Sequence, residues 1–141
     1  MCGFASWVDF NIDLKEQSDA LLKMSASLSR RGPDAGGNLL ENCAALIHRR
    51  LIVVDPEGGA QPMTEKAKGE TYTLVYNGEL YNTEDIRREL KILGYSFFGH
   101  SDTEVLLKAY IEWGADCLQK LNGIFAFAVW HQHAKKLFCA R

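Results

Sequence analysis

The sequence of 141 residues lacks several kinds of segment that would point away from an ordinary folded protein. It has no run of about 18 apolar residues, so we expect no membrane-spanning helix. Its N-terminus has no basic stretch followed by an apolar core, so we expect no secretory signal. The net charge of −2 is not the basic excess of a nucleic-acid-binding protein. These absences predict a cytoplasmic protein that binds neither membranes nor nucleic acid.

Cysteine is sparse and widely spaced, and the sequence has no C-x-x-C pair. Without a secretory signal, we expect these residues to be free thiols rather than disulfides. We also expect no metal site. His131 and His133 are separated by one residue, but no cysteine or carboxylate lies near them in the sequence, so we interpret them as part of a polar turn.

The composition that is present, 47% hydrophobic and 24% charged, is typical of one soluble globular domain. Apolar periodicity and turn residues predict an alternation of short strands and helices. The expected helices cover residues 14–29, 83–93, 101–113 and 116–121. The expected strands cover residues 2–8, 44–47, 51–54, 72–76, 97–98, 124–130 and 136–140. The segments at 44–47 and 51–54 are either two strands or one bent strand. Strands in two groups with helices outside them predict an α+β fold with layered sheets.

Local signals sharpen some of these boundaries. Asp13 followed by Glu16 resembles a capping box, and so does Ser101 followed by Glu104. Asn82 is a good N-cap residue for the helix after it. Gly94 occupies the place of a glycine that follows a helix C-terminus.

Glycines also predict irregular segments. We expect residues 31–37 and the loop at residues 55–59 to be irregular, and Asn77-Gly78 to end its strand in a turn.

The chain stops after the strand at residues 136–140, which belongs to an expected hairpin. An end at that point predicts that the natural polypeptide continues.

Cys2 is the residue with the most distinctive chemistry. Removal of the initiator Met1 would give it a free α-amine beside its thiol. An α-amino group titrates near 7.7–8.0, so it can accept the thiol proton and return it to a leaving group. The alternative is a structural cysteine buried on the first strand, because free cysteine packs as a small hydrophobic residue.

Polar clusters at strand ends and in adjacent loops suggest partners for this thiol. They are residues 48–50, 76–82 and 99–103. An arginine can bind an α-carboxylate, a carboxylate can bind an α-ammonium, and an Asn amide beside a Gly N–H can stabilise an oxyanion. This set fits an amide substrate with an amino-acid head. Each cluster also has a plain alternative: a turn at Asn77-Gly78, a helix cap at Ser101-Asp102, and solvated arginines at Arg49 and Arg50.

Several motifs in one order make the sequence recognisable along its whole length. It resembles the N-terminal class II glutamine amidotransferase domain of glutamine-hydrolysing asparagine synthetases. The motifs that carry the resemblance are Cys2-Gly3-Phe4, Arg31-Gly32-Pro33-Asp34, the run from His48 to Asp55, Gly59-Ala60-Gln61-Pro62-Met63, the run from Tyr76 to Asn82, Ser101-Asp102-Thr103-Glu104 and the run from Leu121 to Ala128.

The resemblance implies an N-terminal nucleophile (Ntn) hydrolase fold, which is a four-layer αββα sandwich. Residues 1–141 would form an incomplete amidotransferase type 2 domain. The C-terminal synthetase domain of the family would be absent. The resemblance also implies a role for each matching residue. Cys2 would be the nucleophile, and Asn77 with the N–H of Gly78 would form the oxyanion hole. Arg50 would bind the α-carboxylate of L-glutamine. Asp102, together with Gly78 and Glu79, would bind the α-ammonium group of the same substrate. Main-chain groups of Val53 and Val54 would line the pocket.

The resemblance further implies how the product is used. Ammonia released through a glutamyl thioester would pass to the synthetase domain, which would use ATP and Mg²⁺ to make asparagine from aspartate. The glutaminase domain itself would need no cofactor and no metal. Two alternatives stay open: a non-catalytic module that binds glutamine or docks on a synthetase, and an amidotransferase with a different ammonia acceptor. A homodimer also stays open.

Overall fold

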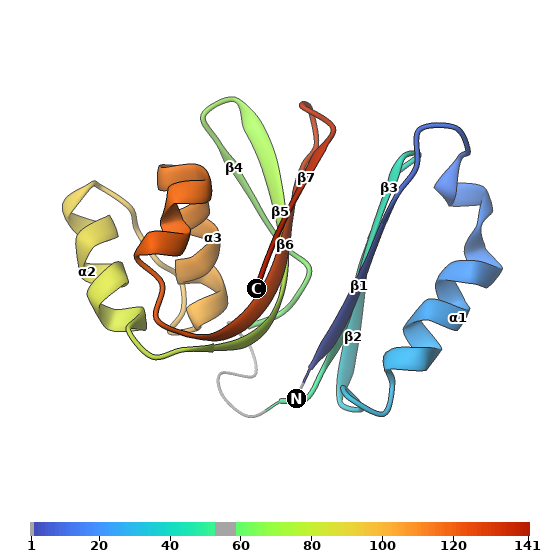
Figure 1. Ribbon diagram of the computed structural model, residues 1–141, viewed down its shortest axis with the longest axis horizontal. Helices are drawn as coiled ribbons and strands as arrows, with labels where there is room; N and C mark the ends of the chain where they lie inside the picture. Colours follow the sequence, from blue (N-terminus) through green and yellow to red (C-terminus); the bar gives the residue numbers. More distant parts are fainter. Residues whose placement is uncertain (1, 53–58) are drawn as a thin grey trace.

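The computed structural model describes residues 2–52 and 59–141, which fold into two antiparallel sheets between outer helices (Figure 1). The first sheet has the strand order β1-β3-β2 and the second the order β4-β5-β6-β7. The strands of the first sheet are β1 (Gly3–Val8), β2 (Ala35–Leu40) and β3 (Ala44–Arg50). The strands of the second sheet are β4 (Met63–Ala67), β5 (Glu70–Leu80), β6 (Gly123–His131) and β7 (Lys136–Ala140).

Helices cover the outer face of each sheet. Helix α1 (Ser18–Leu28) lies on the first sheet, α3 (Asp102–Trp113) lies on the second, and α2 (Thr83–Ile92) packs against α3 (Figure 1). The 3-10 turns η1 (Leu14–Glu16) and η2 (Gly114–Gln119) precede α1 and follow α3. This is the expected α+β sandwich of four layers, αββα. None of the described helices has the length and apolarity needed to cross a membrane.

Strands β5 and β6, in the middle of the second sheet, have apolar side chains packed on both faces. Side chains alternate between the faces of a strand, so Leu74 and Phe127 contact the helices, while Val75 and Trp130 face the first sheet. All four side chains are buried. The strand predicted at residues 124–130 is confirmed as β6, which is buried from Phe127 to Trp130.

Several boundaries predicted from local signals are confirmed. The side chain of Ser101 accepts a hydrogen bond from the N–H of Glu104 at the start of α3. Gly94 follows α2 with a φ of +97°, a conformation that glycine adopts without a Cβ penalty. Strands β6 and β7 form the predicted hairpin.

Other expectations are wrong. The helix expected at residues 14–29 is divided into η1 and α1, with Gln17 between them. Residues 97–98 form no strand, and the side chain of Phe98 is fully exposed. The side chain of Asn82 makes no capping bond to α2, and instead donates to the carbonyl of Lys120 and accepts from the N–H of Asn122.

The sheet edges hold two strands that the sequence did not predict. Gly36 and Gly37, expected to be irregular, belong to β2, which pairs with β3. Strand β4 pairs with β5. Neither segment has a strong apolar alternation. Pairing with a neighbouring strand therefore stabilises their extended conformation, which local propensity alone does not favour.

The segment Asn77-Gly78 is not a turn. Strand β5 continues through Leu80, and Gly78 pairs with Phe125 of β6. A Cβ on Gly78 would lie 2.3 Å from the carbonyl oxygen of Ile124. Glycine is therefore required here by the approach of two strands. Leu51 and Ile52 lie outside any strand, and Val53 and Val54, with the loop predicted from residue 55, fall outside the described residues apart from Gly59.

Candidate active site

A cavity of about 540 Å³ lies where both sheets meet the N-terminus of α3. Its wall contains every predicted site residue that the structure describes. These residues come from the start of β1, the end of β3, the second half of β5 and the start of α3: Cys2, Arg50, Asn77, Gly78, Glu79 and Asp102. Val53 and Val54, also predicted to line the pocket, lie outside the described residues.

Cys2 lies beside the segment that leaves β3. Its thiol donates to the carbonyl of Leu51 at 3.6 Å, and its sulfur accepts from the N–H of Leu51 at 3.4 Å. The pairing of Gly3 with Arg49 holds β1 against β3 and brings Cys2 to this position. The carbonyl of Cys2 also accepts from Nε of Arg31 at 3.2 Å. The backbone of Leu51 therefore holds the thiol at the cavity wall, and Arg31 holds the Cys2 carbonyl.

The segment Arg31-Gly32-Pro33-Asp34 supports both Cys2 and Arg50. The N–H of Asp34 donates to the carbonyl of Arg50 at 3.0 Å, and its Oδ2 accepts from the N–H of Ile52 at 2.7 Å. A Cβ on Gly32 would lie 2.2 Å from the carbonyl carbon of Arg49. This motif was part of the resemblance, but no role was assigned to it. The structure shows that it supports the end of β3, where the buried Arg50 reaches the cavity.

Asp102 is held by the second sheet. Its Oδ2 accepts from the hydroxyl of Tyr76 at 2.7 Å and from the N–H of Leu80 at 3.3 Å. Burial and the nearby Asp102 charge raise the pKa of Tyr76 well above its ordinary value of 10. The hydroxyl therefore stays protonated and remains a donor. A carboxylate has about four acceptor sites, so Asp102 can also accept from a cation in the cavity.

The backbone before Asn77 is held by side chains from two other segments. The N–H of Tyr76 donates to Oε1 of Gln61 at 2.6 Å, and the carbonyl of Tyr76 accepts from Nε2 of His48 at 3.1 Å. A carbonyl only accepts, so Nε2 of His48 carries the proton. Tyr76, Gln61 and His48 all belong to the motifs that carry the resemblance, and their supporting contacts appear only in the tertiary structure.

His48 connects the two sheets from a buried position, with 1% of its surface exposed. Burial lowers its pKa to about 4, and the positive charge of Arg50 acts in the same direction. His48 is therefore neutral at pH 7. Its hydrogen bond joins β3, which carries Arg50, to β5, which carries Asn77 and Gly78.

The site combines a thiol, a buried guanidinium, carboxylates and amide donors, and this set suits acyl transfer from an amino-acid amide. Among the described residues, no group of three or more His, Cys, Asp or Glu side chains could hold a metal ion. The described cysteines, Cys2, Cys43, Cys117 and Cys139, are free thiols.

Comparisons with known proteins agree with this chemistry. The model of a family described as glutamine amidotransferase domain matches residues 1–141. The chain is 53% identical over 141 residues to glutamine-hydrolysing asparagine synthetase 3 of Bacillus subtilis, covering 100% of this chain and 23% of that protein. It is 38% identical over 130 residues to glutamine-hydrolysing asparagine synthetase B of Escherichia coli, covering 92% of this chain and 23% of that protein.

A solved structure supports the fold. Glutamine phosphoribosylpyrophosphate amidotransferase of B. subtilis superposes with a TM-score of 0.73 at 20% identity, over 94% of this chain and 35% of that chain. At this identity the likeness concerns the fold alone. The chain spans about a quarter of the length of the curated relatives named above.

Proposed function

The chain belongs to the glutamine amidotransferase domain family, and on this basis we propose that it hydrolyses the side-chain amide of L-glutamine to glutamate and ammonia. One observation carries the proposal: a single cavity brings together the Cys2 thiol, the Arg50 guanidinium, the Asp102 carboxylate and the Asn77-Gly78 segment. These groups come from distant parts of the chain, and each has a part in the chemistry of a glutamine amide.

The two charges of the amino-acid head would be bound by opposite charges of the cavity. Arg50 binds the α-carboxylate, because its guanidinium can donate two parallel hydrogen bonds. Asp102 binds the α-ammonium, assisted by Gly78 and Glu79. Main-chain groups of Val53 and Val54 would complete the pocket. The head group would then direct the side-chain amide toward Cys2.

The reaction would begin once Met1 is removed and the α-amine of Cys2 is free. This amine takes the thiol proton while the sulfur attacks the amide carbon, and the carbonyl electrons move to oxygen. The side-chain amide of Asn77 and the N–H of Gly78 donate to the oxyanion. When the oxyanion collapses, the C–N bond breaks and the nitrogen leaves as ammonia with the proton held by the α-amine.

A γ-glutamyl thioester on Cys2 remains after ammonia leaves. Water attacks its carbonyl carbon and gives one proton to the α-amine. The C–S bond then breaks, the thiol regains its proton, and glutamate is released. The glutaminase steps use only groups of this chain, without a cofactor or metal.

The ammonia would serve a synthetase domain in a longer cytoplasmic protein, with residues 1–141 as its amidotransferase domain. The relatives are named asparagine synthetases and are about four times as long as this chain. We propose that the acceptor is aspartate, activated by ATP and Mg²⁺ in that other domain. The alternatives of a non-catalytic module or a different acceptor would be distinguished by glutamine turnover and by the product of the longer protein.

The proposal is tested by the intact mass of the protein after incubation with a diazo-ketone analogue of glutamine, together with glutamate release from glutamine. We expect loss of Met1, one adduct and steady turnover. Cys2→Ala should abolish both adduct and turnover, whereas Cys43→Ala, which alters another half-buried thiol, should retain them. Retention of Met1 without an adduct, or turnover by Cys2→Ala, would contradict the mechanism.

A further inference from the structure

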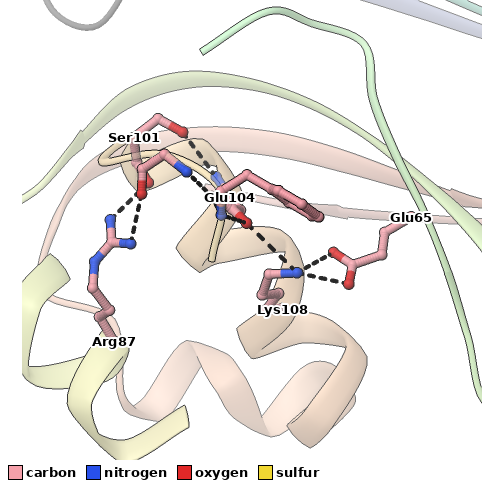
Figure 2. Close-up of polar contacts among 7 residues, drawn as sticks. Glu65, Arg87, Ser101, Glu104 and Lys108 are labelled. Atoms are coloured by element: carbon pink, nitrogen blue, oxygen red, sulfur yellow. Dashed lines mark hydrogen bonds and ion pairs between the residues drawn. The ribbon is translucent and has the colours of Figure 1, made fainter. Parts of the chain in front are cut away.

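Residues 98–101, which connect the helical region of α2 to Asp102, are held by buried charges. Arg87 of α2 donates from Nη1 to the carbonyl of Gly99 at 2.9 Å and from Nη2 to the carbonyl of Ser101 at 3.4 Å (Figure 2). Only 4% of Arg87 is exposed. Its guanidinium therefore fixes two carbonyl groups of the segment immediately before the α3 N-terminus.

Glu104 of α3 holds the N–H groups of the same segment. Its carboxylate accepts from the N–H of Phe98 at 2.9 Å and from the N–H of Gly99 at 3.0 Å. Glu104 is 5% exposed. The spacing of Ser101 and Glu104 predicts only a capping box, whereas the Glu104 carboxylate binds the loop before the cap.

The charges are compensated within the network. Nζ of Lys108, one turn after Glu104, lies 3.6 Å from the Glu104 carboxylate and 2.7 Å from that of Glu65 on β4 (Figure 2). Nε of Arg87 donates to Glu84 at 3.1 Å. An uncompensated buried charge is strongly destabilising, but a paired and hydrogen-bonded one can be held rigidly.

Apolar burial does not explain how this segment is held, because the side chain of Phe98 is fully exposed. The carbonyl groups of the segment instead bind the Arg87 guanidinium of α2, and its N–H groups bind the Glu104 carboxylate of α3. The segment also forms the cavity wall at His100 and Ser101, and Asp102 follows it directly. Polar groups outside the cavity therefore set the backbone that carries the Asp102 carboxylate.

We infer that Arg87 and Glu104 are positioning residues that place Asp102 for the α-ammonium group of the substrate. The inference rests on the proposed glutaminase function. A carboxylate that binds an ammonium must be held within a fraction of an ångström, because displacements of about 1 Å can lower rates about 100-fold. The network provides this precision from the side of the segment that faces away from the substrate.

The test compares glutamine with glutaric acid monoamide, which has the same amide and carboxylate but no α-ammonium group. We expect Glu104→Gln and Arg87→Lys to lower kcat/KM for glutamine about tenfold to 100-fold, chiefly through KM. Both variants should leave kcat/KM for the monoamide near that of the unchanged protein. A general loss of folding would lower both values together, so the ratio separates positioning from stability.

Matched controls come from the same helices. Arg88, next to Arg87 on α2, is exposed and pairs with Asp85. Glu112, on α3, binds Lys68 and Tyr95 away from the segment. Arg88→Lys and Glu112→Gln should leave both substrates unaffected.

A second readout does not depend on catalysis. Hydrogen exchange at the amides of Phe98 and Gly99 should become faster in Glu104→Gln, because these amides lose a charged acceptor. If Glu104→Gln does not fold, Arg87→Lys, which keeps the charge, decides the question by its substrate ratio. An equal decrease for both substrates, or no decrease for glutamine, would overturn the inference while the glutaminase function stands. Absence of glutamine turnover in the unchanged protein would instead contradict the proposed function, and the inference with it.

Discussion

The hydroxyl of Tyr76 donates a hydrogen bond of 2.7 Å to Oδ2 of Asp102 and so joins an inner strand of the second sheet to the first residue of α3. The N–H of Leu80 donates to the same oxygen at 3.3 Å. Tyr76 is 3% exposed, and its raised pKa keeps the hydroxyl protonated. The orientation of this carboxylate is therefore set by β5 as well as by its own helix.

Removal of that hydroxyl should weaken glutamine binding. Tyr76→Phe keeps the buried ring and deletes one hydrogen bond to a charged group, and such a loss corresponds to about tenfold or more in affinity. We expect KM for glutamine to rise by that factor with little change in kcat, measured by steady-state glutamate release. Tyr95→Phe is the matched control, because the Tyr95 hydroxyl donates to Glu112 outside the cavity. An unchanged KM in Tyr76→Phe would contradict the role given to Asp102.

Arg50 and Arg49 offer a test on adjacent residues. Consecutive side chains of a strand point to opposite faces, and Nε of Arg49 donates to the carbonyl of Gly32 at 3.2 Å, whereas Arg50 lines the cavity. Arg50→Lys keeps the charge but loses the planar fork that binds a carboxylate through two bonds. We expect it to raise KM for glutamine about tenfold or more, while Arg49→Lys leaves KM near its original value. Equal effects of the two substitutions would argue against α-carboxylate binding by Arg50.

Gly78 should tolerate no side chain. The Cβ of Gly78→Ala would lie 2.3 Å from the carbonyl oxygen of Ile124 and 2.6 Å from the Cα of Phe125. The strands must separate, which should lower the free energy of unfolding by about 1–3 kcal/mol and move the Gly78 N–H, so that kcat falls.

Gly94→Ala separates these two effects. Gly94 has open space around its Cβ position but a φ of +97°, so a similar loss of about 1–3 kcal/mol should arise from backbone strain alone. Denaturant unfolding and kcat measured together provide the check. A reduced kcat in both variants would mean that stability, rather than the position of Gly78, controls activity.

His48 should make stability depend on pH in the acidic range. Its pKa is lowered from an ordinary 6.5 to about 4, so between these values the unfolded chain binds more protons than the folded one. The contribution of neutral His48 to the free energy of unfolding is complete above pH 6.5. It is lost as the pH falls toward 4, by roughly 3 kcal/mol in total.

Urea unfolding between pH 7.5 and 4 measures this dependence. His48→Gln should show a shallower decrease in the free energy of unfolding. Some decrease should remain, because burial also lowers the pKa of His131. An identical pH dependence in the variant would show that His48 does not titrate as described.

Local signals in the sequence predicted the elements that depend on neighbouring residues. Ser101 caps α3 because its side chain and the N–H of Glu104 are three residues apart. The apolar run at residues 124–130 predicted β6 because removing such side chains from water is favourable wherever their partners lie in the chain. Strands β2 and β4 were missed because their backbone partners lie elsewhere in the chain, on β3 and β5.

The residue types of the site, from Cys2 to Asp102, were determined by the sequence alone, because their chemistry belongs to the side chains and their order to the motifs. Tertiary structure alone decided how they are supported. It showed that Gly78 belongs to a strand packed against β6, that Tyr76 orients Asp102, and that Arg87 and Glu104 hold the segment before it. Such contacts join residues that folding brings together, and their distances are properties of packed layers that no local pattern contains.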